Sequence, residues 1–225
     1  MEKTDHPYET FISVDVETAG PNPSEYSLLT IGACGVTGRP STFYIELCPV
    51  NKKALPEALA ISRLSMERLT ERGTPPKQAM LQFESWLKEQ TPEGQRPVFV
   101  AFNAAFDWMF VNDYFHRFLG RNPFGHAAVD IKTFYMGHAS VAWAETSMRN
   151  VSSRYLGNQQ LTHHALRDAM DQAEILLTDV TYDQFAGDFR IHYAVVRALE
   201  IIGEAAKRLP PSLRDEYPTI PWRGM

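Results

Sequence analysis

Cysteine is scarce in this sequence, and two features typical of exported or membrane proteins are missing. The 225 residues include only Cys34 and Cys48, and neither belongs to a Cys-x-x-Cys or Cys/His cluster, so no zinc site is suggested. The first residues lack the charged-then-apolar pattern of a signal peptide, and no apolar run approaches the length of a membrane span. We therefore expect a cytoplasmic protein that is neither secreted nor inserted in a membrane.

An excess of positive charge is also absent. Lysine and arginine number 22 against 27 aspartates and glutamates, which gives a formal net charge of −5. This balance argues against general electrostatic coating of nucleic acid, although a local basic rim can still hold a phosphate backbone. Hydrophobic residues make up 44% of the chain, which is enough for one sizeable core and a small appendage.

Strand and helix signals alternate along most of the chain. Apolar runs rich in branched and aromatic residues predict strands at 11–16, 28–36, 41–47, 97–102 and 127–131, with a hairpin turning at 38–40. Apolar residues at threefold and fourfold spacing predict helices at 56–72, 75–88, from 103 onward, 148–156 and 163–177. This order indicates an α/β domain over residues 1–178, in which helices cover a mixed sheet.

Asp15 and Glu17 carry the first chemical signal. Residues two apart on a strand point to the same face, so both carboxylates would project together from an otherwise apolar strand end. Such a pair suffers mutual repulsion and desolvation, which a bound cation removes. Taken alone, the pair is more simply explained as two solvated charges, and it gains weight only from the acidic residues further along the chain.

Two further carboxylates and a histidine follow. Asp107 lies in the first turn of a predicted helix with Asn103 as a plausible cap, although helix-dipole effects alone favour acidic residues there. Asp168 lies near the apolar face of the helix predicted at 163–177, where a carboxylate needs a partner. His163 and His164 begin that helix. Together these residues supply hard oxygen ligands for magnesium and a base that titrates near neutral pH.

The order and spacing of these residues resemble the DnaQ-like, DEDDh-type 3′→5′ exonucleases. Val14–Gly20 is similar to the first motif of that family, especially as found in ribonuclease T, and Val100–Asp107 is similar to the second. The third motif has a histidine and an aspartate separated by four residues, and His163–Ala169 matches it. That spacing selects His163 rather than His164 as the catalytic histidine. Val129–Thr133 is similar to a strand-end segment common in these enzymes.

This resemblance implies a ribonuclease H-like fold, with a five-stranded mixed sheet and helices on both faces. It also implies a site for two Mg²⁺ ions, for which Mn²⁺ can substitute, and neutral His163 as the base that deprotonates the attacking water. The implied metal ligands are Asp15, Glu17, Asp107 and Asp168. The expected reaction releases nucleoside 5′-monophosphates from the 3′ ends of single-stranded DNA or RNA, and the sequence does not distinguish the two polymers.

Substrate contacts are expected at the ends of two predicted strands. The resemblance places the terminal nucleotide beside Thr18 and Ala19. Phe102 and Asn103 are further candidates, because the aromatic ring offers a surface on which a base can stack. The remaining aromatic residues of the following helix have the spacing of a core-facing stripe; these are Phe106, Tyr114 and Phe118.

Residues 179–225 resemble a second family. Apolar residues recur at threes and fours from Thr181 until Pro210-Pro211, which predicts one amphipathic helix. Residues 181–185, 197–208 and 217–222 resemble HepT-like HEPN ribonuclease toxins, whose catalytic arginine and histidine follow the matched tryptophan. Because the sequence stops at Met225, we expect a truncated helical extension that packs or dimerises, without HEPN catalysis. A fusion remnant without a role is the alternative.

The competing functional class is a catalytically silent protein that binds nucleic acid or links to a toxin. The intact carboxylates and His163 argue against it, because drift would be expected to erode at least one of them. We therefore predict an exonuclease that forms a homodimer. A nucleotidyltransferase-type partner, acting through the C-terminal segment, is a weaker expectation.

Overall fold

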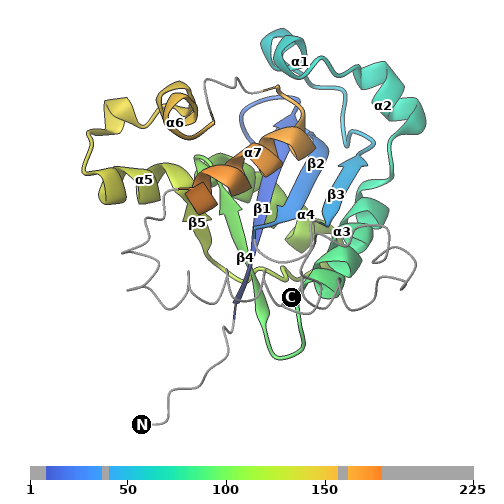
Figure 1. Cartoon of the computed structure of the whole chain (residues 1–225). Coiled ribbons are helices and arrows are strands. Elements are labelled where there is room, and N and C mark those ends of the chain that lie inside the picture. Colours follow the sequence, from blue (N-terminus) through green and yellow to red (C-terminus); the bar gives the residue numbers. More distant parts are fainter. Residues whose placement is uncertain (1–8, 37–40, 157–161, 179–225) are drawn as a thin grey trace, which may run out of the picture. The chain divides into compact units, whose positions relative to one another are not determined.

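The computed structural model describes residues 9–36, 41–156 and 162–178, which form a five-stranded mixed sheet flanked by helices (Figure 1). Its spatial order is β3 (Thr42–Glu46), β2 (Leu28–Gly35), β1 (Glu9–Thr18), β4 (Arg96–Ala101) and β5 (Ala128–Asp130). The central strand β1 pairs antiparallel with β2 and parallel with β4. The predicted mixed sheet is thereby confirmed.

Helices cover both faces of this sheet. They are α1 (Pro56–Ser62), α2 (Met66–Arg72), α3 (Pro76–Gln90), α4 (Ala104–Leu119), α5 (Ile131–Ala139), the 3₁₀ helix η1 (Trp143–Glu145), α6 (Met148–Tyr155) and α7 (Ala165–Thr178). Residues of α3 and α4 build the main core on one face, and residues of α5, α6 and α7 build a second core on the other. Helix α7 lies across β1 and β2 (Figure 1).

The alternation of side chains along β1 gives its two faces different roles. Ile12, Val14 and Val16 are buried in the main core, where their apolar surface stabilises the sheet against α3 and α4. Asp15 and Glu17 point to the opposite face, where they meet residues of α7 and of the turn before it. The strand therefore anchors the core and presents two carboxylates from the same few residues.

Two helix predictions need correction. The helix predicted over 56–72 is two helices, because Arg63 adopts a left-handed conformation with φ 57° and ends α1, and Ser65 then caps α2. Helix α5 was not predicted. The Asp130 side chain starts it by accepting a hydrogen bond from the Lys132 amide. A three-residue strand followed at once by a helix leaves little periodic signal of either kind.

Helix α7 also differs from its prediction. It begins at Ala165 rather than at His163. Met170 is 45% exposed, whereas Asp168 and Gln172 are buried. The buried face of α7 thus carries polar groups that a pattern of apolar residues cannot reveal.

Two sequence predictions lie outside the described residues: the hairpin turn at 38–40 and the helical extension at 179–225. Within the described ranges, every helix is too short or too polar to cross a membrane.

Candidate active site

One row of the sheet positions the start of α7. Asp15 of β1 pairs with Gly32 of β2, and Gly32 pairs with Tyr44 of β3. A Cβ atom on Gly32 would lie 2.1 Å from the carbonyl carbon of Ala165 and from the amide nitrogen of Leu166, so this approach requires glycine. The first turn of α7 therefore rests directly on the sheet beside Asp15.

Three predicted site residues converge at this turn. Glu17, His163 and Asp168 each offer a ligand atom, and these atoms all lie within 4.8 Å of one another. Asp168 is 2% exposed. Its Oδ1 accepts hydrogen bonds from the backbone N–H and the hydroxyl of Thr162, at 2.9 and 3.0 Å. The protein itself therefore fixes the orientation of this carboxylate.

Asp107 joins the site from the first turn of α4. It is buried, and its Oδ1 accepts a hydrogen bond from the Val16 amide at 3.1 Å. Because Val16 lies between Asp15 and Glu17, this bond fixes Asp107 beside both carboxylates of β1. Asp15 is held in turn by Gln172 of α7, whose Nε2 donates to Asp15 Oδ1 at 2.8 Å.

Burial and neighbouring negative charges raise the pKa of three of these carboxyl groups. Burial, followed by the charges of Asp168 and Asp107, raises the pKa of Glu17 to about 8. Burial likewise raises the pKa of Asp107 to about 8, against the opposing effect of the Val16 amide. For Asp15, burial and the charges of Asp107, Glu17 and Asp168 raise the pKa well above its ordinary value. The protein alone thus disfavours the fully ionised cluster.

This donor set suits a hard divalent cation. Carboxylate oxygens are typical ligands of Mg²⁺ and Mn²⁺. Every ion pair found within the described ranges involves acidic residues outside this cluster. A bound cation would therefore supply the missing positive charge and favour the ionised carboxylates. The residues that could hold it are Asp15, Glu17, Asp107 and Asp168.

His163 lies in the turn before α7. Its φ of 53° is left-handed, which costs about 1–2 kcal/mol for a residue with a Cβ atom. The next residue, His164, has a different role. Its carbonyl accepts the first hydrogen bond of the helix, from the Asp168 amide at 3.0 Å, and its imidazole ring stacks on Tyr44. His163, and not His164, belongs to the group formed with Glu17 and Asp168.

Thr18 is the last residue of β1, and Ala19 is the first residue of the loop that leads to β2. The buried Thr18 hydroxyl donates to the carbonyl of Gly20 at 2.8 Å. Ala19 is fully buried, and its N–H donates to the carbonyl of Ser27 at 2.9 Å. A Cβ atom on Gly20 would lie 2.4 Å from the Tyr26 ring, so the loop closes tightly there. The two predicted contact residues thus shape the loop, and their side chains are largely occupied within it.

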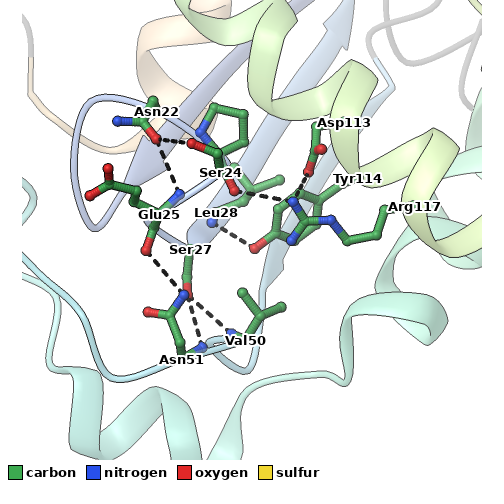
Figure 2. Close-up of polar contacts among 11 residues, drawn as sticks. Asn22, Ser24, Glu25, Ser27, Leu28, Val50, Asn51, Asp113, Tyr114 and Arg117 are labelled. Atoms are coloured by element: carbon green, nitrogen blue, oxygen red, sulfur yellow. Dashed lines mark hydrogen bonds and ion pairs between the residues drawn. The ribbon is translucent and has the colours of Figure 1, made fainter.

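Figure 2 shows how the end of this loop is fastened. The Leu28 amide donates to the Tyr114 hydroxyl of α4 at 2.8 Å (Figure 2). The Ser27 hydroxyl accepts hydrogen bonds from the amides of Val50 and Asn51, at 3.0 and 3.4 Å. The loop that follows the first two carboxylates is therefore held by α4 and by the segment before α1.

Phe102 and Asn103 connect β4 to α4. Phe102 is half-buried against the second core, and Asn103 is exposed with φ 61°. The Asn103 side chain does not cap α4, contrary to the prediction. Asp130 Oδ1 instead accepts hydrogen bonds from the amides of Asn103 and Ala104, at 2.9 and 3.2 Å. After burial, Asp130 is the charge that raises the pKa of Asp107.

The sequence did not reveal Gln172 and Thr162 as parts of this site. Gln172 bridges β1 and the segment after β4, since its Nε2 donates to Asp15 and its Oε1 accepts a hydrogen bond from the Phe102 amide at 3.2 Å. Its fourfold spacing from Asp168 places both on one helix face and was the available signal. Thr162 lies in no periodic pattern, so its contact with Asp168 had no signal in the sequence.

The chain is similar to known exonucleases. Residues 10–179 match the family described as the 3′-5′ exoribonuclease Rv2179c-like domain. The 3′-5′ DNA exonuclease Cap18 of Escherichia coli is 43% identical over 167 residues, which cover 74% of this chain and 89% of that relative.

Solved structures agree with the fold. The nuclease domain of 3′hExo, a DEDDh family member solved with rAMP, is similar over 75% of this chain and 90% of its own, with a TM-score of 0.63 and 16% identity. Exonuclease I of E. coli in complex with a dT13 oligonucleotide covers 80% of this chain and 43% of its own, with a TM-score of 0.60 and 15% identity. The predicted ribonuclease H-like fold is confirmed.

The C-terminal segment has relatives of its own. Residues 166–225 match the family described as Ribonuclease HepT-like. The probable ribonuclease HepT of Thermococcus cleftensis is 38% identical over 60 residues, which are 27% of this chain and 54% of that protein. The putative RNase MJ0127 of Methanocaldococcus jannaschii is 49% identical over 47 residues, 21% of this chain and 39% of that protein. The chain thus spans about half or less of these relatives.

Proposed function

This chain belongs to the Rv2179c-like family of 3′-5′ exoribonuclease domains and is a 3′→5′ exonuclease, and we propose that it hydrolyses single-stranded nucleic acid from the 3′ end to nucleoside 5′-monophosphates. The observation that carries this proposal is the convergence of Glu17, His163 and Asp168 within 4.8 Å, beside the partly buried Asp15 and the buried Asp107. Phosphodiester hydrolysis needs an activated water and a stabilised leaving oxygen, and this cluster has the groups for both.

The carboxylate cluster is the proposed site of two Mg²⁺ ions, with Mn²⁺ as a substitute. When bound, the ions supply Lewis acidity and stabilise the charge that develops on the phosphate oxygens. Three of the four ligands already have an orienting donor in the protein: Val16 for Asp107, Gln172 for Asp15 and Thr162 for Asp168. Such donors fix ligand geometry in advance, which supports a site of defined geometry.

His163 is the proposed general base. Its imidazole is exposed next to Glu17 and Asp168, where the substrate phosphate has access to it. The neutral ring accepts a proton from the attacking water as the water oxygen bonds to phosphorus. The bond from phosphorus to the 3′ oxygen of the shortened strand breaks in the same displacement, and a nucleoside 5′-monophosphate leaves.

We propose that the terminal nucleotide lies between the loop that starts at Thr18 and Ala19 and the segment of Phe102 and Asn103. The loop is rigid because its amides and hydroxyls are bonded internally, so little order needs to be gained on binding. Asn103 offers an exposed amide, and the Phe102 ring offers a partly accessible surface for a base.

The relatives differ in the nucleic acid that their descriptions name: the family is described as an exoribonuclease, and Cap18 as a DNA exonuclease. The test is a gel time course on 5′-labelled single-stranded DNA and RNA of equal sequence, with Mg²⁺ and then with EDTA. A ladder that shortens from the 3′ end and stops in EDTA is expected, and the faster polymer identifies the substrate class.

Absence of cleavage by folded protein, in Mg²⁺ and in Mn²⁺, would contradict the proposal. It would favour the alternative of a catalytically silent protein that binds nucleic acid or interacts with a toxin system.

For residues 179–225 we propose a role in homodimerisation, with a nucleotidyltransferase-type protein as a second candidate partner. The support is the match to HepT-like proteins over 166–225, together with the amphipathic pattern of the segment. Light scattering after size-exclusion chromatography is expected to show a dimer for the full chain and a monomer for the chain without residues 179–225. A shortened chain that still has the mass of a dimer would refute the dimerisation role.

A further inference from the structure

Tyr44 of β3 is placed to act on the turn that carries His163. Its side chain is 36% exposed, and its ring stacks on the His164 imidazole with centroids 4.7 Å apart and planes 20° apart. This separation is typical of attractive aromatic pairs. Because His164 directly follows His163, Tyr44 contacts the segment that holds the general base.

The glycine of β2 explains how Tyr44 reaches that segment. Asp15, Gly32 and Tyr44 occupy successive positions in one row of the sheet. The first turn of α7 approaches the sheet over Gly32, where no side chain is tolerated. The residues just before α7 therefore lie between Asp15 and the ring of Tyr44, and the His164 side chain stacks on that ring.

The turn needs such support. His163 has a left-handed backbone, with φ 53°, and conformations of this kind persist only where the surroundings determine them. The hydrogen bonds of Thr162 to Asp168, and of the Asp168 amide to the His164 carbonyl, lie within the turn and the first turn of α7. Tyr44 adds a contact from a separate element, β3.

Tyr44 is anchored from its other end. Its hydroxyl donates to Glu46 Oε1 over a long 3.4 Å, and the same oxygen accepts a hydrogen bond from Arg68 of α2 at 2.8 Å. A continuous set of contacts thus runs from α2 through Glu46 and Tyr44 to His164.

We propose that Tyr44 is a positioning residue, whose stack on His164 holds His163 where it can accept a proton; this rests on the proposed function of His163. A general base must lie within hydrogen-bond reach of the proton it accepts. A misplacement of about 1 Å can lower a rate by about a hundredfold. Loss of the stack therefore slows the chemical step and leaves substrate binding nearly unchanged.

The test compares Tyr44→Ala and Tyr44→Phe on single-stranded DNA and RNA and on the p-nitrophenyl ester of thymidine 5′-monophosphate. Tyr44→Ala is expected to lower kcat by about tenfold to a hundredfold on every substrate that the wild type cleaves, with KM changed by less than about twofold. Tyr44→Phe keeps the ring and is expected to retain most of the wild-type kcat.

Phe134→Ala is the matched control. Phe134 is also half-exposed and stacked on a histidine, His138, but it lies on α5. This variant is expected to leave kcat unchanged.

The division between kcat and KM decides between two roles of the ring. A higher KM for the oligonucleotides, with unchanged kcat and no effect on the small ester, would overturn the proposal and make Tyr44 a stacking surface for nucleobases.

His164→Ala adds a second check. The double variant Tyr44→Ala/His164→Ala is expected to be no slower than either single variant, because all three variants lose the same stack between Tyr44 and His164. Additive losses would contradict the proposal.

Amide hydrogen exchange tests the stack without relying on activity. Tyr44→Ala is expected to speed exchange of the Asp168 amide, which bonds to the His164 carbonyl, by about tenfold or more, and to leave the Val111 amide in α4 unchanged. Unchanged exchange at Asp168 would overturn the positioning role. A wild type that cleaves no substrate would instead refute the proposed function, and the exchange result would still decide whether Tyr44 holds the turn.

Discussion

Val16 contributes to the active site through its backbone while its side chain is part of the core. Its isopropyl group packs in the cluster shared with α3 and α4, and its N–H donates to Asp107. The same residue thus connects core packing to the position of a proposed metal ligand. Core substitutions beside Val16 are for this reason expected to affect the site as well as stability.

At the same scale, replacing the proposed general base is expected to separate catalysis from metal binding. His163→Ala is expected to lower kcat by about a hundredfold to ten-thousandfold, because proton transfer to a positioned base contributes that much. The carboxylates remain, so the increase in melting temperature caused by Mg²⁺ is expected to persist. Steady-state kinetics and thermal unfolding with and without Mg²⁺ check both outcomes.

His116→Ala, which changes an exposed histidine of α4, is the control and is expected to leave both quantities unchanged. Near-wild-type turnover in His163→Ala would exclude His163 as the base.

Among the elements, α7 approaches the sheet so closely that β2 needs a glycine at position 32. Its first turn lies over Gly32, and its buried face carries Asp168 and Gln172, which reach the site. The helix is therefore positioned for the site as much as for the core. A shift of α7 would move the proposed ligand Asp168, the donor Gln172 and the turn of His163 together.

Gly32→Ala tests this dependence. The added methyl group would collide with the backbone at Ala165 and Leu166, so we expect a loss of about 1–3 kcal/mol in the free energy of unfolding, as for overpacking elsewhere. Turnover is expected to fall by more than the unfolded fraction explains. Urea unfolding and activity on folded protein measure the two effects.

Gly137→Ala in α5 is the matched control, because a Cβ atom there meets nothing within 4 Å. Its stability is expected to be unchanged or to increase by about 0.5–1 kcal/mol. Equal behaviour of the two alanine variants would contradict the close approach of α7 to Gly32.

At the scale of the whole molecule, the acidic cluster couples folding to pH and to metal. In the folded protein the pKa of Glu17 and of Asp107 is about 8, against ordinary values of 4.5 and 3.8. Between those values the folded state binds more protons than the unfolded state, so stability is greatest at low pH and decreases as the pH rises. A divalent cation opposes this loss by binding the ionised carboxylates of the folded state.

We therefore expect the melting temperature in EDTA to fall as the pH rises from about 5 to about 8, and excess Mg²⁺ to remove most of the fall. Asp107→Asn is expected to reduce the slope in EDTA. Glu57→Gln, at another first-turn acidic residue that is exposed on α1, is expected to leave it unchanged. A melting temperature in EDTA that rises over this pH range would contradict the pKa directions.

The structure shows how far local patterns reach. The strands and most helices follow from alternation and fourfold spacing, which depend on neighbouring residues only. Helix α5 and the break at Arg63 escaped because a short strand and a left-handed residue leave no periodic signal. Asn103 occupies the N-cap position of α4, but its side chain makes no capping hydrogen bond, because its backbone is left-handed rather than extended. The amides of Asn103 and Ala104 donate instead to Asp130, which is distant in sequence.

The sequence by itself determined the kind of chemistry, since hard carboxylate oxygens and a histidine in motif spacing indicate a phosphodiesterase site whatever the packing. Only the tertiary structure decided which groups support that site. Gln172 and Asp15 are 157 positions apart. Tyr44 of β3 stacks on His164, which lies far from it in the sequence. Contacts of this kind depend on how closely α7 approaches β2, and that distance is decided at Gly32 by the absence of a side chain.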